Sequence, residues 1–537
     1  MRTFSIAFGV AVSMIAAPCT LAQEHDRHDH AAALGEVNFP VSCNDEAQVR
    51  FNAAAALLYS FYWEKVDAAV AAVLQADPTC AMAHWAQAVA SLDNPLGSPP
   101  TPRQEQEGWA AVERAKQLGG KTQRERDYIA AVEVVFKDHA TVPFRSRAAS
   151  YEKALEQLHT RYPQDAEAAV LYAYWMQVTA DRNDMTHAKQ LQSARLLEKV
   201  AQAQPRHPGV VHFLIHAYDF PSIAEHGIDA ARRYAAIAPD SPHALHMPSH
   251  IFSRVGLWQD SIDTNRRSHA AATTDRDRYH AIDYLTYASL QLARDMDARQ
   301  WVEFVESNET PNEHTRQIAY AAAVIPARYA LERGEWAQAA QLTLHPAQSA
   351  FDWRDFPEGE ATNAYARGLG AARMGNASAA KAEADRLGKL REAMVAQKKD
   401  YWVEQAGIQL DAINAWIARA EGRNEEAVTL MVAAADREDR TEEHIMMPGR
   451  VIPVREMLGE LLLDLQRPQM ALAAFEESLR NDPNRFRSVY GAGRAAELAG
   501  ERDKARAFYS KLLLQVGPNA NGRDEIRYAR AVANRVR

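Results

Sequence analysis

The sequence has no excess of positive charge and, after its first residues, no long hydrophobic run. Its 61 lysine and arginine residues stand against 70 aspartate and glutamate residues, which gives a formal net charge of −9 and a pI of about 6.1. A nucleic-acid-binding domain usually shows a basic balance, so we expect no nucleic-acid partner. A membrane-spanning helix needs roughly 18 apolar residues, so we expect no transmembrane segment once the N-terminus is removed.

Several motifs of well-known enzyme classes are also missing. No glycine-rich phosphate loop follows a strand-like segment, and residues 368–370 (Gly-Leu-Gly) lie inside an alanine-rich helical pattern. The G-x-S-x-G turn of serine hydrolases does not occur. No histidine pair has the H-E-x-x-H form of the zincin proteases. The sequence therefore supports none of these three classes.

The N-terminus is the exception to the lack of apolar runs, and it has the order of a signal peptide. Arg2 supplies positive charge, residues 4–17 are mostly apolar, and residues 20–22 (Thr-Leu-Ala) form a small-x-small cleavage site. We expect residues 1–22 to be removed and the protein to be periplasmic or secreted in a bacterium. A lipoprotein signal through Cys19 fits less well, because a proline directly precedes that cysteine.

Cysteine is scarce, and after signal removal only Cys43 and Cys80 remain. Two cysteines in an oxidising compartment are expected to pair. In the chain-entropy picture, a bond across a loop of this length stabilises the fold by about 3–4 kcal/mol. Two free buried thiols are the alternative.

We expect residues 23–45 to be a disordered, histidine-rich segment. After cleavage at Ala22, His25 is the third residue of the mature chain. A free amine, two deprotonated amides and that imidazole form a square-planar nitrogen set suited to Cu(II) or Ni(II). His28 and His30 add to this N-terminal metal tail. A solvated tail without a role is the alternative.

From Val49 onward the chain is nearly all helical, because alanine is abundant and strand-like alternation does not persist. A chain of 537 residues exceeds the roughly 250–300 residues of a single core, so we expect several domains or a repeat array. Second helices end at a proline in several places, as after Asp77, Tyr162, Gln204, Ala238 and Asp482. A turn residue followed five positions later by a small residue recurs, at Gly256 and Ser261, Gly334 and Ala339, Gly375 and Ala380, Gly422 and Ala427, Gln466 and Ala471, and Gly500 and Ala505.

This pattern resembles the tetratricopeptide repeat, or TPR. The best match runs from Ala471 to Phe475, through Asp482-Pro483, to residues 490–500 (YGAGRAAELAG). The resemblance implies an all-α fold, an α-solenoid of TPR-like helical hairpins that bury one another's apolar faces. We divide it into an N-terminal degenerate array, 46–300, and a C-terminal array, 301–537.

A narrower resemblance is to a family of exported bacterial TPR-like proteins. It rests on four segments and implies no particular activity. At one position, Tyr59, the sequence departs from the histidine expected in that family. The matching segments are Asp77 to Trp85, His212 to Asp219, His243 to Phe252 (HALHMPSHIF) and Pro448 to Glu456.

Two segments interrupt the array. Asn94 to Pro102 is rich in proline, and Asp436 to Pro453 carries Glu442 and His444. Each is either a linker between hairpins or a loop that covers the groove of the solenoid.

Histidines are concentrated on three successive first helices. His212 and His216 lie four residues apart, and His280 lies on the third of these helices. The middle stretch, Ser241 to Asn265, carries His243, His246 and His250 on one face. Pro248 should kink this helix and weaken the geometry of the pair on either side of it.

Helical histidine pairs can chelate a metal, with further ligands from another element. We expect His216, His246, His250 and His280 to be the ligands, and Asp219 and Asp283 to orient their imidazoles. Zinc, copper and iron all suit such a set. The alternative is that each histidine is a hydrogen-bonded structural group. Arg254, Arg328 and Arg455 are candidates for an anionic ligand, or else members of salt bridges.

Two functions of different classes follow. The first is an exported binding or scaffold protein whose concave groove, lined by the first helices, holds a protein, a peptide or a small ligand. The histidine cluster then binds a transition metal or a small ligand. The second is a metal-dependent enzyme, a hydrolase or an oxidoreductase, with the cluster as its active site.

Overall fold

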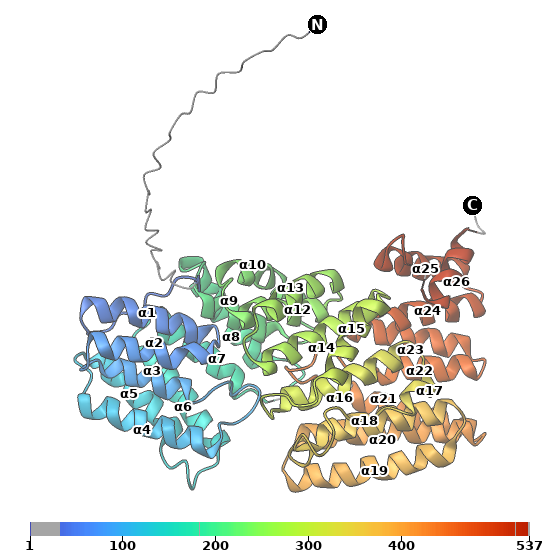
Figure 1. The fold of residues 1–537 in the computed structure, drawn as a ribbon, viewed down its shortest axis with the longest axis horizontal. Coiled ribbons are helices and arrows are strands. Elements are labelled where there is room, and N and C mark those ends of the chain that lie inside the picture. Colours follow the sequence, from blue (N-terminus) through green and yellow to red (C-terminus); the bar gives the residue numbers. More distant parts are fainter. Residues whose placement is uncertain (2–32, 182, 521, 535–537) are drawn as a thin grey trace. The chain divides into compact units, whose positions relative to one another are not determined.

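The computed structural model describes residue 1 and residues 33–181, 183–520 and 522–534. The expected signal peptide, 1–22, and the N-terminal metal tail of His25, His28 and His30 lie outside the described residues. Residues 33–537 form one compact unit (Figure 1).

Every regular element among the described residues is helical. The first half of the chain holds α1 (Asp45–Tyr59), α2 (Trp63–Ala76), α3 (Ala81–Ala90), α4 (Pro102–Leu118), α5 (Gln123–Phe136), α6 (Phe144–Arg161), α7 (Ala166–Val178), α8 (Ala188–Ala203), α9 (Pro208–Tyr218), η1 (Ala224–Gly227), α10 (Ile228–Ile237), α11 (Pro242–His246), α12 (Pro248–Arg254) and α13 (Trp258–Ala271). The second half holds α14 (Asp275–Gln291), α15 (Asp295–Ser307), α16 (Arg316–Glu332), α17 (Trp336–Ala339), η2 (Trp353–Asp355), α18 (Pro357–Arg373), α19 (Ala377–Ala396), α20 (Asp400–Ala420), α21 (Asn424–Glu438), α22 (Val454–Asp464), α23 (Pro468–Asn481), α24 (Phe486–Leu498), α25 (Arg502–Val516) and α26 (Asp524–Asn534).

Consecutive helices pack as hairpins, from α1 with α2 to α24 with α25, and this TPR-like architecture confirms the expected α-solenoid. The turn glycines all adopt positive φ, from +68° at Gly334 to +83° at Gly500, and Gln466 takes the same conformation at +57°. A left-handed residue after the last helical turn reverses the chain within a few residues. The small residue five positions later is buried in all six hairpins, so the two helices approach closely there.

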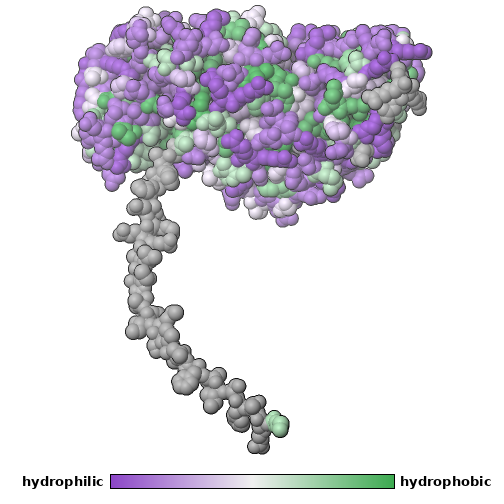
Figure 2. Space-filling model, turned by 90° about the horizontal axis from the view of Figure 1, so that it is seen from above, coloured by the Kyte–Doolittle hydropathy of each residue, from purple (hydrophilic) through white to green (hydrophobic). Residues whose placement is uncertain are grey.

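The prolines also act as expected. Five helices end two residues before a proline, as the restriction on the residue preceding proline predicts. They are α2, α6, α8, α10 and α23. Figure 2 shows that the outer surface seen from above is mostly hydrophilic, with scattered apolar residues. Among the described residues, no helix is both long and apolar enough to cross a membrane.

The first helices of neighbouring hairpins also contact one another, and they form an inner layer that is buried. All residues of α9 and α12 are buried, as is α16 from Ile318 to Glu332. The C-terminal hairpins pack back onto this layer, because Arg485 bonds to Glu332 and the Trp258 indole donates to the Asn484 carbonyl at 2.8 Å. The inner side of these helices is therefore filled by protein rather than left as an open groove. Buried contacts join residues before position 300 to residues after it. The division of the array at residue 300 stays a prediction.

The chain before α1 is packed against the helices over its described part. Phe39 is fully buried against Phe51, Trp85 and Tyr128. Backbone groups at residues 39 and 41 donate to side chains of α1. Disorder across the whole of 23–45 was therefore wrong for residues 33–44, because an aromatic anchor in this polar segment fills a gap between hairpins.

Cys43 and Cys80 form the expected disulfide, with Cα atoms 5.3 Å apart. The bond ties the segment before α1 to the start of α3 and closes a loop of 37 residues.

We expect the double variant Cys43→Ser, Cys80→Ser to lose about 3–4 kcal/mol of unfolding free energy, because the unfolded chain regains the entropy of an open loop. Urea denaturation of the oxidised parent and of the variant measures the difference. Equal midpoints, with the parent shown by mass spectrometry to be oxidised, would contradict this expectation.

Candidate metal centre

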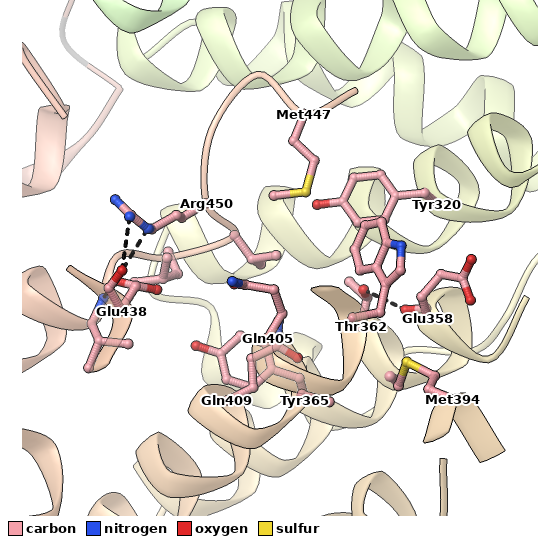
Figure 3. A pocket seen from close by; sticks show the side chains of 16 residues that line it. Tyr320, Glu358, Thr362, Tyr365, Met394, Gln405, Gln409, Glu438, Met447 and Arg450 are labelled. Atoms are coloured by element: carbon pink, nitrogen blue, oxygen red, sulfur yellow. Dashed lines mark hydrogen bonds and ion pairs between the residues drawn. The ribbon is translucent and has the colours of Figure 1, made fainter. Parts of the chain in front are cut away.

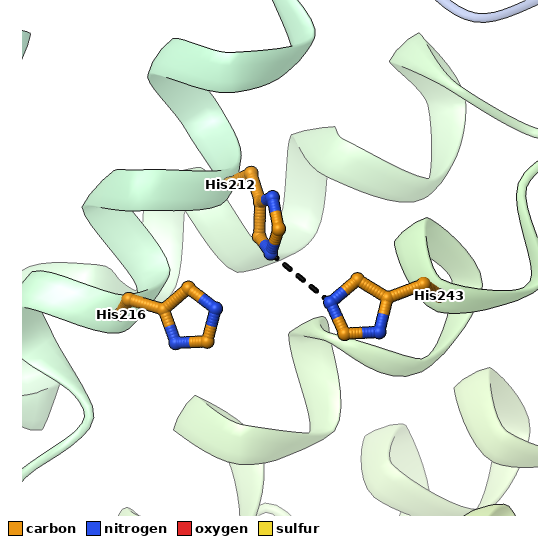
Figure 4. Close-up of side chains that lie close together, drawn as sticks. All are labelled: His212, His216 and His243. Atoms are coloured by element: carbon orange, nitrogen blue, oxygen red, sulfur yellow. Dashed lines mark hydrogen bonds between the residues drawn. The ribbon is translucent and has the colours of Figure 1, made fainter. Parts of the chain in front are cut away.

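Six histidines gather where α9, α11, α12 and α14 meet. They form two groups, and within each group one ring nitrogen of every histidine lies within 4.8 Å of the others. Triad A is His212, His216 and His243, and triad B is His246, His250 and His280. Figure 4 shows triad A, with His212 and His216 on one helix and His243 reaching them from another.

The structure divides the four predicted ligands between these groups. Three of them make up triad B, whereas His216 belongs to triad A together with His212 and His243, which were outside the predicted ligand set. The two triads adjoin, since the ring centroids of His216 and His250 are 6.2 Å apart. A role in metal binding stays a prediction for all six.

Pro248 breaks the helix as expected, but it does not separate the histidines on either side. Helix α11 ends at His246 and α12 begins at Pro248. Met247 between them keeps helical dihedrals, with φ −51° and ψ −35°. The chain loses a hydrogen bond without losing its helical rise, so the Nε2 atoms of His246 and His250 lie 3.0 Å apart. The expected weakening of this pair was wrong.

In triad B, hydrogen bonds at the far side of the His246 and His250 rings fix which nitrogen of each carries the proton. The Asn265 amide donates to the Ser261 carbonyl at 2.8 Å, which directs its oxygen to Nδ1 of His246 at 2.7 Å. Nδ1 of His250 donates to the Asp219 carboxylate at 2.8 Å. An imidazole that donates from Nδ1 has a lone pair at Nε2, so both rings present acceptors to each other.

Two nitrogen lone pairs at this distance repel unless a cation lies between them. Burial lowers the pKa of all six histidines, to about 3 for His212 and about 4 for His246, so a proton is held weakly there. A metal with nitrogen ligands at about 2.0–2.1 Å has adjacent ligands roughly 3.3–3.6 Å apart. The 3.0 Å between His246 and His250 is slightly shorter than this spacing, and the three rings of triad B offer nitrogens within 4.8 Å of one another.

Triad A is oriented in the same manner. Nδ1 of His212 donates to the Tyr59 carbonyl at 2.7 Å, and its Nε2 lies 3.1 Å from Nε2 of His243. Gly209 permits this contact, because a Cβ there would lie 2.7 Å from the Tyr59 ring. The Tyr59 hydroxyl donates to Glu167 instead. The residue that departs from the family pattern therefore contributes its carbonyl, not its side chain, to the cluster.

His216 has no hydrogen-bond partner for either ring nitrogen, although both are buried. Buried polar groups are nearly always paired. Its ring lies against His212, at a centroid distance of 4.8 Å, and lines the same cavity as His243, His250 and His280. The unpaired imidazole points independently to a missing ligand.

Asp219 links triad B to the segment between α21 and α22, residues 439–453, here called the 439–453 loop. The Arg254 guanidinium donates to Asp219 at 3.0 Å, to Glu443, and to the Met447 carbonyl at 3.2 Å. Burial raises the pKa of Asp219 to about 6, and Arg254 opposes that shift. Asp219 thus accepts a hydrogen bond from His250, and the arginine that balances its charge also holds the loop. The role of Asp219 beside a bound metal stays a prediction.

Asp283 does not orient an imidazole in the contacts that the structure gives. Its Oδ1 lies 3.5 Å from Nε of Arg328, whose other nitrogens donate to the carbonyls of Gly449 and Arg450. The carboxylate faces an arginine rather than an imidazole, so these contacts do not support the expected role, which stays a prediction. Arg254, Arg328 and Arg455 are all committed to salt bridges, so they are poor candidates for an anionic ligand.

The far end of the 439–453 loop is fixed in the same manner. Figure 3 shows Met447 and Arg450 on its arch, with Arg450 directed toward Glu438. Arg450 also lies 3.4 Å from Asp482. The 439–453 loop is therefore an ordered part of the fold rather than a flexible linker.

A cavity of about 440 Å³ adjoins the histidines and is called the histidine cavity. His216 and His243 of triad A and His250 and His280 of triad B line it. Both segments that interrupt the array line it as well, and their contributing residues are Asn94, Gly97, Ser98, Pro99, Thr101, His444, Ile445 and Met446.

No family model matches the chain, and no curated protein matches it. Among solved structures, the human IFIT1 dimer with PPP-AAAA is similar at 11% identity, over 89% of this chain and 96% of that chain, with a TM-score of 0.40. The structure of Naa15/Naa10 bound to HypK-THB is similar at 12% identity, over 91% of this chain and 74% of that chain, with a TM-score of 0.25. Likenesses this low carry no argument about function, which rests on the residues of this chain.

The Asn265→Leu variant tests the orientation of triad B. Removing the acceptor at Nδ1 frees the His246 ring to rotate, and we expect metal affinity to fall about 10–100-fold. A competition titration with a chromophoric chelator measures the affinity. Ser268→Ala, which removes another buried hydrogen bond of α13, is the matched control, and an equal loss in both variants would speak against a specific role of Asn265.

Proposed function

We propose that this protein is a TPR-type binding protein that holds transition metal ions in its buried histidine triads. The observation that carries this proposal is the pair of facing Nε2 atoms of His246 and His250, 3.0 Å apart. Asn265 and Asp219 take up the protons on the other side of the two rings. A cation is the missing partner of such a pair.

The donor set narrows the kind of metal. Six imidazole nitrogens suit zinc, copper or iron, whereas magnesium, calcium and manganese prefer oxygen ligands. The carboxylate of Asp219 is engaged with Nδ1 of His250 and with Arg254, which leaves the ligand set neutral.

The ligand that the protein holds is, in this proposal, a small molecule rather than a peptide or a protein. The histidine cavity, about 440 Å³, lies within the range of roughly 300–1,000 Å³ of small-molecule sites. The buried inner layer of helices leaves little groove for an extended chain. The net charge of −9 still speaks against a nucleic acid.

The compartment is part of the proposal. The N-terminal pattern of residues 1–22 and the pairing of Cys43 with Cys80 both support export to an oxidising compartment, periplasmic or extracellular. The segment His243 to Phe252 supports membership of the exported bacterial TPR-like family. We assign the metal-binding role to this segment together with α9 and α14.

Metal analysis of the full chain tests the proposal. The parent carries His25→Ala, His28→Ala and His30→Ala, so that the tail adds no metal. After incubation with zinc, copper or iron, we expect stoichiometric metal in this parent and a loss of the ion held by triad B when His246→Ala and His250→Ala are added. Elemental analysis after gel filtration gives the metal content per chain.

The control for this experiment is the pair His226→Ala and His314→Ala, which removes two exposed histidines elsewhere. It should keep the metal, and circular dichroism should show the same helix content in all three proteins. A parent that holds none of the three metals after repletion refutes the proposed function.

A metal-dependent enzyme, hydrolytic or oxidative, is the second candidate. It is favoured by the lining of the histidine cavity, since both segments that interrupt the array contribute to it and partial exclusion of water favours chemistry. An enzyme's metal keeps a coordination position open. We expect azide to change the visible absorption of the Co(II)-substituted protein, and a spectrum indifferent to azide favours a closed binding site.

A further inference from the structure

We infer that triads A and B hold one pair of copper ions, and that this pair binds dioxygen in the histidine cavity. The inference rests on the proposed metal binding and deepens it, since it names the metal, the number of ions and the ligand. Its first support is the arrangement of the rings.

The two triads are neighbours rather than separate sites. The ring centroids of His216 and His250 lie 6.2 Å apart, and those of His243 and His246 lie 6.3 Å apart. His243 and His246 also belong to the same helix, α11. Histidine rings of the two triads are thus in direct contact, so ions held in the two triads are close enough for one small ligand to bind both.

The charge of the surroundings favours copper(I). Three buried carboxylates around the cluster each face an arginine, with Asp219 and Glu443 at Arg254 and Asp283 at Arg328. Asp277, which lines the histidine cavity, also lies 3.5 Å from Arg276. Two divalent ions would add four uncompensated positive charges to this buried site, whereas two copper(I) ions add two. Uncompensated buried charge is costly, and copper(I) accepts three imidazoles without a further anion.

The Phe61 ring that covers triad A also favours copper(I). The Phe61 ring contacts His212 at 4.5 Å and stacks on His243 at 5.5 Å between centroids. An aromatic ring in this place offers no ligand and excludes water. On the side of triad B, the Tyr284 hydroxyl lies 3.4 Å from the nitrogens of His250.

The histidine cavity supplies the place for dioxygen. Four of the six histidines, two from each triad, line it. A three-coordinate ion has a free position, and the two histidines that each triad places on this cavity put dioxygen within reach of both ions. The step balances within the site, because each copper(I) gives up one electron and becomes copper(II). Dioxygen accepts the two electrons, its O–O double bond becomes the single bond of peroxide, and the peroxide forms bonds to both ions.

The experiment uses the full chain with the three tail histidines replaced by alanine. The protein is loaded with copper(I) without oxygen, desalted, and then exposed to oxygen. We expect two coppers per chain, uptake of one dioxygen for each pair, and a weak electron paramagnetic resonance signal, since the spins of two bridged copper(II) ions couple. Elemental analysis, an oxygen electrode and the resonance spectrum give these quantities.

Variants of single triads sharpen the result. His280→Ala and His243→Ala each leave one triad whole, and both side chains border the cavity, where a truncation leaves space rather than a buried hole. We expect each variant to bind one copper, to give a full copper(II) signal after oxidation, and to lose the paired uptake of dioxygen. The matched control is His226→Ala, which should behave as the parent does.

The outcomes separate this inference from the proposed function. Two coppers with full, uncoupled signals and no dioxygen uptake overturn the pair and leave metal binding intact. A protein that retains zinc but does not retain copper overturns the choice of metal. A parent without any metal removes both. Because these results come from the parent, they hold even if a triad variant fails to fold.

Discussion

Each hairpin of this protein has an apolar face that only its neighbours can cover, and the rest of the structure depends on that requirement. It draws the first helices into one buried layer, and it gathers six imidazoles from α9, α11, α12 and α14, of which four are buried and two, His243 and His280, are half-buried. A backbone carbonyl, an amide and a carboxylate satisfy the outer nitrogens of three of these rings. The Nε2 atoms of these rings face other imidazole nitrogens instead of hydrogen-bond donors. This arrangement makes the site a candidate for metal binding.

A second consequence of burial is the network of arginines around the cluster. Arg254, Arg328 and Arg485 are almost wholly buried, and each contacts a carboxylate. Breaking such a pair costs several kcal/mol, about 3–5 by analogy with other buried pairs. These arginines also bind carbonyls of the 439–453 loop or side chains of distant helices. The same charges thus anchor the loop and close the array on itself.

Much of the fold could be predicted from local signals. The turn glycines, the small residues and the proline stops act within a few residues, so they are legible in sequence, and even Gln466 adopted the expected turn. The gathering of histidines was also predictable, since neighbouring first helices must lie side by side. Their division into two triads was not, because it depends on the rotation of each helix about its axis. Asp283 faces Arg328 for a similar reason, since that contact depends on how α14 and α16 are rotated against each other.

Arg254 connects the hydrogen bond that orients His250 with the anchoring of the 439–453 loop. Its guanidinium balances the charge that fixes the His250 ring and also grips Glu443 and the Met447 carbonyl. If the 439–453 loop lifts away, the arginine loses partners on one side and Asp219 becomes the sole anion it can neutralise. The stability of the docked loop and the strength of His250 as a metal ligand are then thermodynamically coupled. Coupling of this type is reciprocal. An ion seated at the imidazoles would be sensed more than 180 residues further along the chain, as a change in how firmly that segment is held.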